Sequence, residues 1–551
     1  MRAITALAVA ALVLGGSLFL ARDSLILHLP GLIDGWRDPV GPTRELRWDQ
    51  GPDAPAVPVG ERPPNIVLIL ADDMGFNDVS FWGGGPAGGT APTPHIDSIG
   101  HNGVAFSAGY AGHATCAPSR AALLSGRYAT RFGYEFTPVL PAMMPILNRL
   151  NRQQDRIRYP LFHSDRADDV LPYEVMGMPS EELSLAELLG QAGYYTAHVG
   201  KWHLGLTNGM DPNSQGFDDS LRLASGKYLP DDHPQTVNAR QDFDPIDRFL
   251  WATMKHAASF NDSPRFAPPG YVTDYYSDEA VRIIEQNRHR PFFLFLAHFA
   301  PHNPLQALKS DYDALSHIDD HRLRVYAAVI RALDRSVGRV LEALRANGLE
   351  ENTLVVFTSD NGGAGYLGLP DINSPYRGWK STFFEGGIRV PLFLQWPGAL
   401  TAGAVYTQPV HHLDLYATAA AAAGLSPPDD RPVDGVNLLP YLRGEQDGAP
   451  HGELIWRSGH YQAVIAGSWK LQLAARPDKT WLFHLDEDPT EQRNLAAMRP
   501  DKVQELRAIL AAHNAEQQAP AWPSLIEGPV MIDKTRAEPE AIEDEYVYWP
   551  N

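Results

Sequence analysis

Four short, mostly apolar runs, each followed within a few residues by charged, imidazole or amide side chains, constrain this chain more than any other feature. Runs of this length are typical of strands that are buried on both faces, as in a parallel sheet. Because the carboxyl ends of parallel strands meet at one edge, we expect the polar groups to form a single site there. The runs are residues 65–70 before Asp72 and Asp73, 194–199 before Lys201 and His203, 292–296 before His298 and His302, and 354–358 before Asp360 and Asn361.

Helical signals fall between these runs, which is the pattern of an α/β fold. Ser184 and Glu187 have the spacing of a capping box, and Gly193 is placed to end that helix before the next strand. Residues 322–346 carry apolar side chains at helical spacing and stop at an Asn-Gly pair. The sequence therefore predicts a parallel sheet flanked by helices.

The pattern changes after residue 440. Short alternating strands are predicted at 461–465, 469–473 and 481–483, followed by a helix near 501–512. This indicates a small antiparallel sheet with one helix, packed on the main body. The acidic stretch that begins at Ala537 is expected to be a solvated or docked tail rather than a site.

The N-terminus begins with Met1 and Arg2 and then runs uncharged through residues 4–21. That length lies between a signal-peptide core and a minimal transmembrane helix, so a cleaved signal and a retained anchor are both expected alternatives. Either one predicts an extracytoplasmic body, periplasmic or secreted. The predicted organisation is a signal or anchor at 1–22, a Pro- and Gly-rich tether at 23–62, a catalytic domain at 63–440 and a C-terminal subdomain with its acidic tail at 441–551.

Residues 136–179 show no clean periodicity. They are predicted to be an inserted loop region that either borders the mouth of a site or is a solvated surface excursion. The formal net charge of −20 argues against nucleic acid or an anionic membrane as the main partner. We expect membrane contact only through the N-terminal segment, and an anionic substrate would need a locally cationic site.

Two acidic segments, Asp72-Asp73 and Asp360-Asn361, offer carboxylate and amide oxygens at strand ends. Oxygen ligands favour a hard cation, Ca²⁺ or Mg²⁺, over zinc. Taken alone, each pair would more often be a helix cap or a turn, since Asp and Asn favour both. The residues by themselves leave these alternatives open.

Cys116 is the only cysteine in 551 residues, and it opens the run Cys-Ala-Pro-Ser-Arg-Ala-Ala-Leu-Leu-Ser-Gly-Arg. A single cysteine is usually a small buried hydrophobe. Here it lies just before a predicted helix, because Pro118 suits a first turn and residues 121–124 are helix formers. A helix N-terminus favours a bound anion, and Arg120 adds a guanidinium beside it. The run resembles the signature of the sulfatase family, in which this cysteine is oxidised to formylglycine.

Other segments share the resemblance: 71–75 and 358–363 resemble the two that hold the sulfatase calcium, 193–203 the second signature, 300–304 a catalytic histidine segment and 378–391 a lysine segment. The resemblance covers about residues 65–494. It implies an alkaline-phosphatase-like α/β fold with a mixed, mostly parallel sheet and a smaller C-terminal antiparallel-sheet subdomain. By this match the catalytic residues are Cys116, Arg120, Lys201, His203, His302 and Lys380, and the metal ligands are Asp72, Asp73, Cys116, Asp360 and Asn361.

The activity that the resemblance implies is arylsulfatase-like hydrolysis of a sulfate ester by the formylglycine hydrate at position 116. In that scheme Ca²⁺, Arg120, Lys201 and Lys380 stabilise the sulfate oxygens. His302, helped by Lys380, protonates the leaving alcohol, and His203 then deprotonates the second hydroxyl so that sulfate is expelled. The implied partner during maturation is a formylglycine-generating enzyme.

Two alternatives stay open. One is a phosphonate or phosphate diester hydrolase of the same superfamily, in which a histidine is expected in place of the amide at position 361. The other is a non-catalytic binder of sulfated glycans. Aryl sulfates and carbohydrate sulfates are both open as substrates, because the alcohol part is read by loops.

Overall fold

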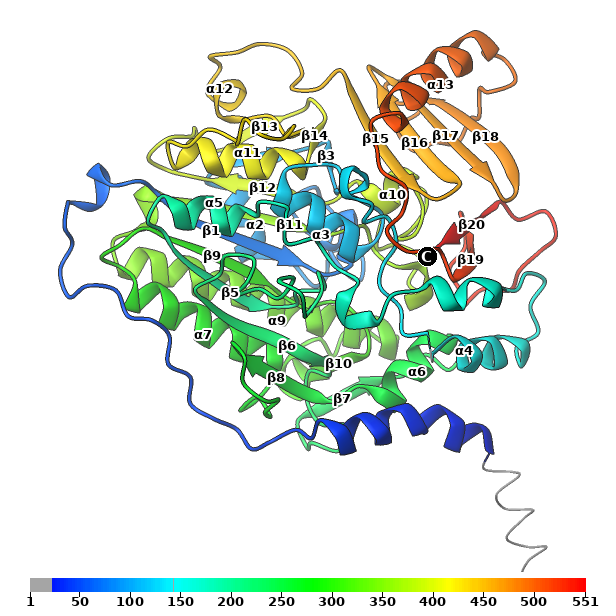
Figure 1. The fold of residues 1–551 in the computed structure, drawn as a ribbon, viewed down its shortest axis with the longest axis horizontal. Coiled ribbons are helices and arrows are strands. Elements are labelled where there is room, and N and C mark those ends of the chain that lie inside the picture. Colours follow the sequence, from blue (N-terminus) through cyan, green and yellow to red (C-terminus); the bar gives the residue numbers. More distant parts are fainter. Residues whose placement is uncertain (1–21, 142) are drawn as a thin grey trace, which may run out of the picture.

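A nine-stranded sheet lies at the centre of the computed structural model, which describes residues 22–141 and 143–551 (Figure 1). Five central strands run parallel, and β12 and β8 pair antiparallel with their inner neighbours. The order is β13 (Ala404–Tyr406), β2 (Val104–Phe106), β12 (Leu392–Gln395), β11 (Thr353–Ser359), β1 (Asn65–Ala71), β9 (Phe292–Ala297), β5 (Tyr195–Gly200), β6 (Asp219–Gly226) and β8 (His256–Phe260).

The four apolar runs are strands β1, β5, β9 and β11, within a residue of their predicted bounds, and they are adjacent in the sheet. All seven residues of β1 are buried, as expected for a strand covered on both faces. The prediction of a mostly parallel α/β sheet is confirmed.

Helices cover both faces of the sheet. On one face Ile66, Leu68 and Leu70 of β1 pack in a core with α3 (Cys116–Ser125), α5 (Leu185–Gln191) and α11 (Leu413–Ala422). On the other face Val67 and Ile69 pack in a core with α2 (Pro94–His101), α7 (Val272–Gln286) and α9 (His321–Ala346). The capping box of α5 is present, because Glu187 N donates to Ser184 Oγ and Ser184 N to Glu187 Oε2.

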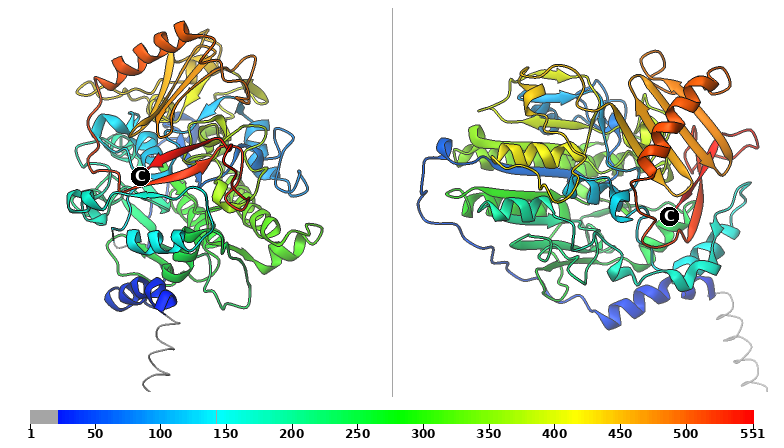
Figure 2. Two further views of the ribbon diagram at one scale, coloured as in Figure 1. Left: turned by 90° about the vertical axis from the view of Figure 1, so that its right-hand side faces the viewer. Right: turned by 45° about the horizontal axis from the view of Figure 1, so that its top comes forward.

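The C-terminal subdomain is an antiparallel sheet of β15 (Glu453–Ser458), β16 (Tyr461–Ala466), β17 (Trp469–Ala475) and β18 (Asp478–His484), covered by α13 (Pro500–Asn514). Figures 1 and 2 show it at one end of the main body. The predicted antiparallel sheet with one helix is therefore confirmed.

The acidic tail is docked rather than solvated. Strands β19 (Ile526–Met531) and β20 (Tyr546–Pro550) pair with each other, and β19 also pairs with β4 (Leu161–Phe162) of the predicted insertion. The carboxylate of Glu540 accepts from the backbone N–H of Arg158 at 3.0 Å. The C-terminus thus fastens the insertion to the body.

The insertion itself is more regular than predicted. It contains α4 (Met143–Arg152), whose Ile146, Leu147 and Leu150 pack against Phe249 of α6 (Pro245–Thr253). The prediction of a loop region is therefore wrong for 143–152, where the prolines and arginines of the segment obscured the helical spacing of the apolar residues.

The predicted signal or anchor, residues 1–22, lies outside the described residues except for Arg22. Residues 22–37 form a helix, and the chain that follows is pinned to the body by Trp48, whose indole N–H donates to Glu279 at 2.6 Å. The predicted Pro- and Gly-rich tether at 23–62 thus begins as a helix and contacts the body. Within residues 22–141 and 143–551, no helix combines the length and apolar character that a membrane crossing requires.

The remaining elements are short. They are β3 (Gly109–Tyr110), β7 (Thr236–Ala239), β10 (Leu305–Leu308), β14 (Val410–His411), α8 (Lys309–Ala314), α10 (Glu385–Ile388), α12 (Leu439–Leu442), η1 (Val59–Glu61), η2 (Phe76–Asp78), η3 (Ala129–Phe132), η4 (Ser164–Asp169), η5 (Tyr173–Val175), η6 (Glu350–Asn352) and η7 (Gly365–Leu367).

Candidate active site

The parallel register brings the strand ends together. Ala71 of β1 pairs with Ser359 of β11, and Ala297 of β9 pairs with Gly200 of β5 and Leu70 of β1. The next residues along each strand therefore emerge at the same edge, as the sequence predicted.

Cys116 is the first residue of α3, and its side chain is almost completely buried. The helix closes at Gly126, which has the left-handed φ of 67° that a glycine adopts without strain. The signature run thus covers one short buried helix and the two residues that follow it.

Three buried ion pairs surround Cys116. Lys201 Nζ lies 2.7 Å from Asp72 Oδ2, and Lys380 Nζ lies 2.8 Å from Asp73 Oδ2. The guanidinium of Arg120 donates from Nε to Asp360 Oδ2 at 2.8 Å. The structure therefore brings three predicted cations and three predicted carboxylates into one cluster.

The sulfur of Cys116 touches both acidic and basic groups. It lies 3.4 Å from Asp72 Oδ1, 3.4 Å from Asp73 Oδ1 and 3.2 Å from Lys380 Nζ. Burial raises the pKa of the thiol well above its usual range, the carboxylates of Asp360 and Asp73 raise it further, and the lysines oppose the shift. The unmodified thiol is therefore protonated and a poor nucleophile.

The oxygen donors at this edge fit a hard divalent cation. One ligand atom from each of Asp72, Asp73, Cys116 and His302 lies within 4.8 Å of the others. Asn361 Nδ2 donates to Asp73 Oδ1 at 2.8 Å, whereas Asn361 Oδ1 is buried with no hydrogen-bond partner. Carboxylate oxygens beside an unpartnered amide oxygen suit Ca²⁺ or Mg²⁺.

The charges around Asp73 settle its ionisation. Burial alone would raise the pKa of Asp73, but the ammonium groups of Lys380 and Lys201 outweigh burial and hold it well below its usual range. Asp73 is therefore an anion at neutral pH.

Two histidines border the cluster. Burial lowers the pKa of His302 to about 3; Asp73 opposes this shift, and Lys201 and Lys380 add to it. Burial and the charges of Lys201 and Arg120 lower the pKa of His203 well below its usual range. Both imidazoles are therefore neutral in this state of the site. The Nδ1 atom of His302 lies 2.6 Å from the carbonyl oxygen of Asn303, so the tautomer that donates there leaves Nε2 facing Asp73 at 3.5 Å.

Sequence reasoning missed Tyr366. Its hydroxyl donates to Asp73 Oδ2 at 2.7 Å and lies 3.3 Å from Lys380 Nζ. The available signal was its position, five residues after Asn361 in a glycine-rich loop.

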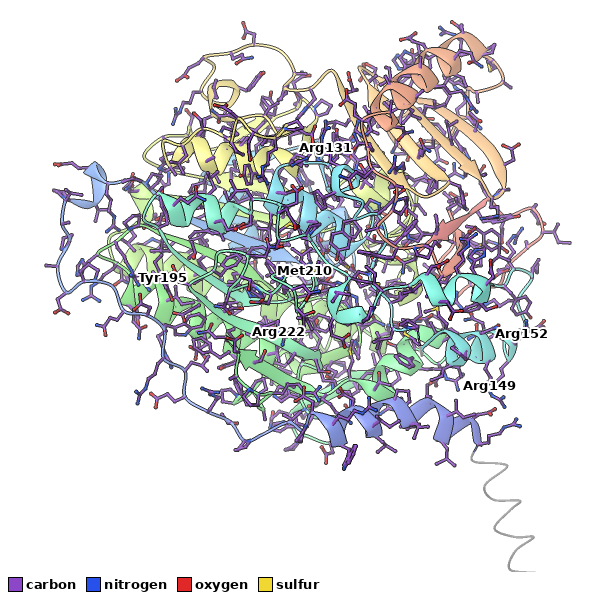
Figure 3. The ribbon with its side chains drawn as sticks, in the orientation of Figure 1. Arg131, Arg149, Arg152, Tyr195, Met210 and Arg222 are labelled. Atoms are coloured by element: carbon purple, nitrogen blue, oxygen red, sulfur yellow. The ribbon has the colours of Figure 1, made fainter. Side chains whose placement is uncertain are left out.

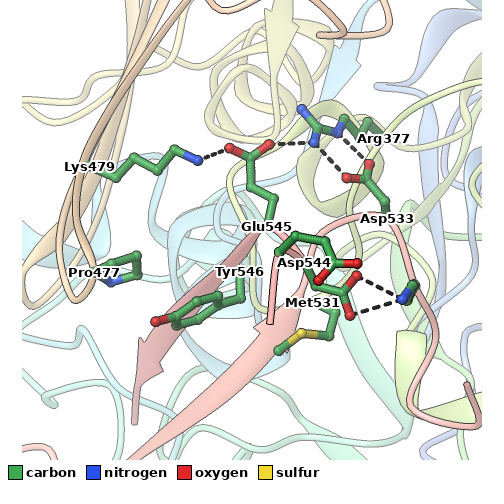
Figure 4. A pocket seen from close by; sticks show the side chains of 10 residues that line it. Arg377, Pro477, Lys479, Met531, Asp533, Asp544, Glu545 and Tyr546 are labelled. Atoms are coloured by element: carbon green, nitrogen blue, oxygen red, sulfur yellow. Dashed lines mark hydrogen bonds and ion pairs between the residues drawn. The ribbon is translucent and has the colours of Figure 1, made fainter. Parts of the chain in front are cut away.

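Sequence reasoning also missed Arg377, which anchors the loop that carries Lys380. Arg377 Nη2 lies 2.6 Å from Asp533 Oδ2 and also binds Glu545, which in turn pairs with Lys479 (Figure 4). Glu545 belongs to the docked acidic tail, and Asp533 lies in the short segment between β19 and that tail. These contacts are therefore made to a residue that precedes Lys380 by three positions in the chain.

The mixed sheet, the charged cluster at its carboxyl edge and the C-terminal antiparallel sheet define an α/β enzyme of the alkaline-phosphatase-like class. The family model described as Sulfatase matches residues 64–425, and the chain belongs to the sulfatase family.

Among its relatives, N-acetylgalactosamine-6-sulfatase of Homo sapiens is 32% identical over 504 residues, covering 84% of this chain and 88% of that protein. Steryl-sulfatase of Mus musculus is 30% identical over 569 residues, covering 85% of this chain and 83% of that protein. A solved structure described as Ps i-CgsB in complex with k-i-k-neocarrahexaose superposes with a TM-score of 0.68 at 30% identity, covering 84% of this chain and 95% of that one. The relatives' names support a sulfatase enzyme rather than a non-catalytic binder.

Proposed function

We propose that this sulfatase hydrolyses the sulfate ester of a sulfated carbohydrate, through a formylglycine formed from Cys116 and with Ca²⁺ bound beside it. The observation that carries the proposal is the position of Cys116 Sγ, within 3.4 Å of two carboxylates and one ammonium group. A thiol with a raised pKa cannot attack a sulfur centre effectively. We therefore propose that a maturation enzyme oxidises Cys116 before the protein becomes active.

Asp72, Asp73, Asp360 and Asn361, together with the side chain at position 116, are the residues that would hold the cation. When bound, Ca²⁺ supplies positive charge to the sulfate and to the oxygen at position 116. Mg²⁺ has the same preference for oxygen donors and stays an alternative.

The lysines and Arg120 have different parts in this proposal. Lys201 and Lys380 each end in a buried ammonium group beside Cys116, so they can turn from their carboxylate partners to the oxygens of a bound sulfate. The guanidinium of Arg120 is fully buried and already engaged, since Nη1 donates to Lys201 O at 2.8 Å and Nε to Asp360. We therefore assign Arg120 the role of positioning Asp360 and the Lys201 backbone.

The two histidines handle protons. We propose that Nε2 of His302 gives a proton to the leaving oxygen, because Nδ1 is engaged at Asn303. The negative charge of a bound sulfate ester would raise the pKa of His302 towards the range in which it carries that proton. His203 is neutral and can accept the proton of the hydroxyl that remains at position 116.

A carbohydrate sulfate is favoured as substrate by the relative named for N-acetylgalactosamine 6-sulfate, which matches over 84% of this chain. The test is release of inorganic sulfate from N-acetylgalactosamine 6-sulfate, from a sterol sulfate and from a simple aryl sulfate. A higher kcat/KM for the saccharide supports the proposal. A higher kcat/KM for the sterol or aryl ester would assign the protein to those substrates instead.

The phosphorus ester alternative is tested on the same enzyme. Asn361 supplies a neutral amide where a diester hydrolase of this superfamily is expected to have histidine, a softer ligand. We therefore expect a higher kcat/KM for an aryl sulfate than for the matched phosphonate monoester. The reverse order would replace the sulfatase proposal by that alternative.

We also propose that the catalytic body is extracytoplasmic, because residues 4–21 are uncharged and follow Arg2. A reporter that works only outside the membrane, fused after Pro64, should be active. Activity of the matching cytoplasmic reporter at the same position would reverse this proposal.

A further inference from the structure

The N-terminal helix, residues 22–37, carries an exposed apolar stripe. Leu25, Leu29, Leu32 and Trp36 are 50%, 53%, 64% and 83% exposed, and Ile33 is 41% exposed. At 100° per residue the first four positions fall within a sector of about 60° on one side of the helix. These five residues are a third of the fifteen large apolar side chains that are exposed in residues 22–141 and 143–551.

The opposite side of this helix faces the protein and carries the acidic groups. Asp23 accepts from Arg149 Nε at 2.9 Å, and Asp34 pairs with Arg265 at 3.0 Å. Arg149 and Arg152 lie on α4, close to the N-terminal helix (Figure 3). A helix on the surface of a soluble protein normally exposes charges on its outer side. Here the outermost sector is apolar, although Leu27 on the inner side is also buried.

The helix is also held firmly. Leu27 is buried among Leu147, Leu150 and Phe249. Gly31 lies so close to α6 that a Cβ there would come within 2.8 Å of the carbonyl oxygen of Ala252. The apolar stripe therefore cannot turn inwards without breaking these contacts.

The sequence next to the stripe indicates what covers it. Residues 3–21 contain no charged side chain and join the helix directly at Arg22. A retained anchor is one of the two alternatives that the sequence leaves open for this stretch, and the stretch is long enough to enter a bilayer. A stripe that begins three residues after Arg22 would then be held at the lipid surface.

We propose that the outer stripe of the N-terminal helix lies in the headgroup region of a lipid bilayer, parallel to its plane, with Trp36 at the interface. A stripe of Leu and Trp suits the headgroup and acyl boundary. The net charge of −20 opposes anionic lipid, so the contact is apolar and does not depend on acidic headgroups. This proposal is independent of the catalytic one.

This contact would set the orientation of the enzyme relative to the membrane. The N-terminal helix lies at one pole of the molecule, and α13 of the C-terminal subdomain lies at the opposite pole in both Figure 1 and the left view of Figure 2. The C-terminal subdomain therefore points away from the membrane.

The test uses the full chain, reconstituted into phosphatidylcholine vesicles, with a fluorophore on one introduced cysteine. The background is Cys116→Ala, so that only the new thiol reacts. The probe position is Leu32→Cys, and the matched control is Met498→Cys, a similarly exposed apolar residue (64% and 73%) just before α13. Thermal unfolding checks that both variants fold alike.

Nitroxide lipids labelled near the headgroup should quench the probe at position 32 by roughly two-fold or more, since the stripe is buried by about 5–10 Å. The probe at position 498 should be quenched by aqueous iodide only. Adding phosphatidylglycerol should not strengthen lipid quenching at position 32.

Three outcomes would overturn the proposal. Iodide quenching at position 32 equal to that at position 498 would mean that the stripe stays in water. Shielding from iodide without lipid quenching would mean that residues 1–21 cover it. Shielding that rises with the protein-to-lipid ratio would mean that a second copy covers it.

Discussion

The ammonium nitrogen of Lys380 lies 3.2 Å from the sulfur of Cys116, although the two residues are 264 positions apart in the chain. Burial alone would lower the pKa of Lys380, but Asp73 and Cys116 outweigh it and raise the pKa well above its usual range. A permanent positive charge is thus fixed beside the residue that carries the proposed nucleophile.

Lys380→Ala should lower kcat for sulfate ester hydrolysis by about 10²–10³-fold, because it removes one preorganised charge from the transition state. The matched control is Lys309→Ala, where the exposed lysine pairs only with Asp313. The measurement is steady-state sulfate release. A kcat for Lys380→Ala within a few-fold of the native value would contradict this role.

Removal of divalent cations by a chelator should abolish turnover and lower the Tm, because a cation that binds only the folded protein stabilises it. Ca²⁺ should restore both. Asp360→Asn should weaken Ca²⁺ binding by at least roughly 10–100-fold, the loss seen when only the partners of metal ligands are changed. Asp313→Asn, at an exposed helix position, is the control. Restoration by zinc alone would argue against an oxygen-ligated site.

Asp533→Asn should lower kcat by about 10–100-fold with a smaller change in KM, since it loosens Arg377 and with it the placement of Lys380. Arg377→Lys should retain part of the activity because the charge is kept. The control is Lys534→Ala, which lines the same pocket but pairs with Asp544 (Figure 4). If Lys534→Ala changed kcat and KM as much as Asp533→Asn does, the effect would not come from the placement of Lys380, and the prediction would be contradicted.

His298 is buried directly after the end of β9, with Nε2 2.9 Å from Ser336 Oγ. Burial lowers its pKa to about 3. The unfolded chain takes up the proton near pH 6.5 and the folded chain only near pH 3, so this residue destabilises the fold as pH falls through that interval. His298→Gln should make the free energy of unfolding less dependent on pH between 6 and 4, by up to about 1.4 kcal/mol per pH unit. His317→Gln, at an exposed position, is the control. Parallel pH profiles for native protein and His298→Gln would contradict the assignment.

The sequence predicted the parts of the fold that are set by local pattern. Residues 65–70 and 354–358 are buried on both faces, and their short continuous apolar runs indicated buried strands. The polar groups that follow parallel strands meet at one edge of the sheet. The capping box at Ser184 was equally local. Cys116, Lys201 and Lys380 were found through their motifs, and the structure places them together.

Contacts made by chain that is distant in sequence could not be predicted in this way. No sequence pattern distinguishes Tyr366 or Arg377 from other loop residues. Only the structure shows that Tyr366 contacts Asp73 and that Arg377 contacts Asp533. The helix at 22–37 overlaps a stretch whose Pro and Gly content predicted a tether. Gly31 is instead the point of closest approach to α6.

The most direct test of the account is the chemical state of position 116 in purified, fully active protein, read by mass spectrometry of the peptide that contains it. The account predicts an aldehyde or its hydrate at this position. It also predicts that Cys116→Ala folds normally and releases no sulfate. A fully active preparation in which position 116 is only an unmodified thiol would contradict it.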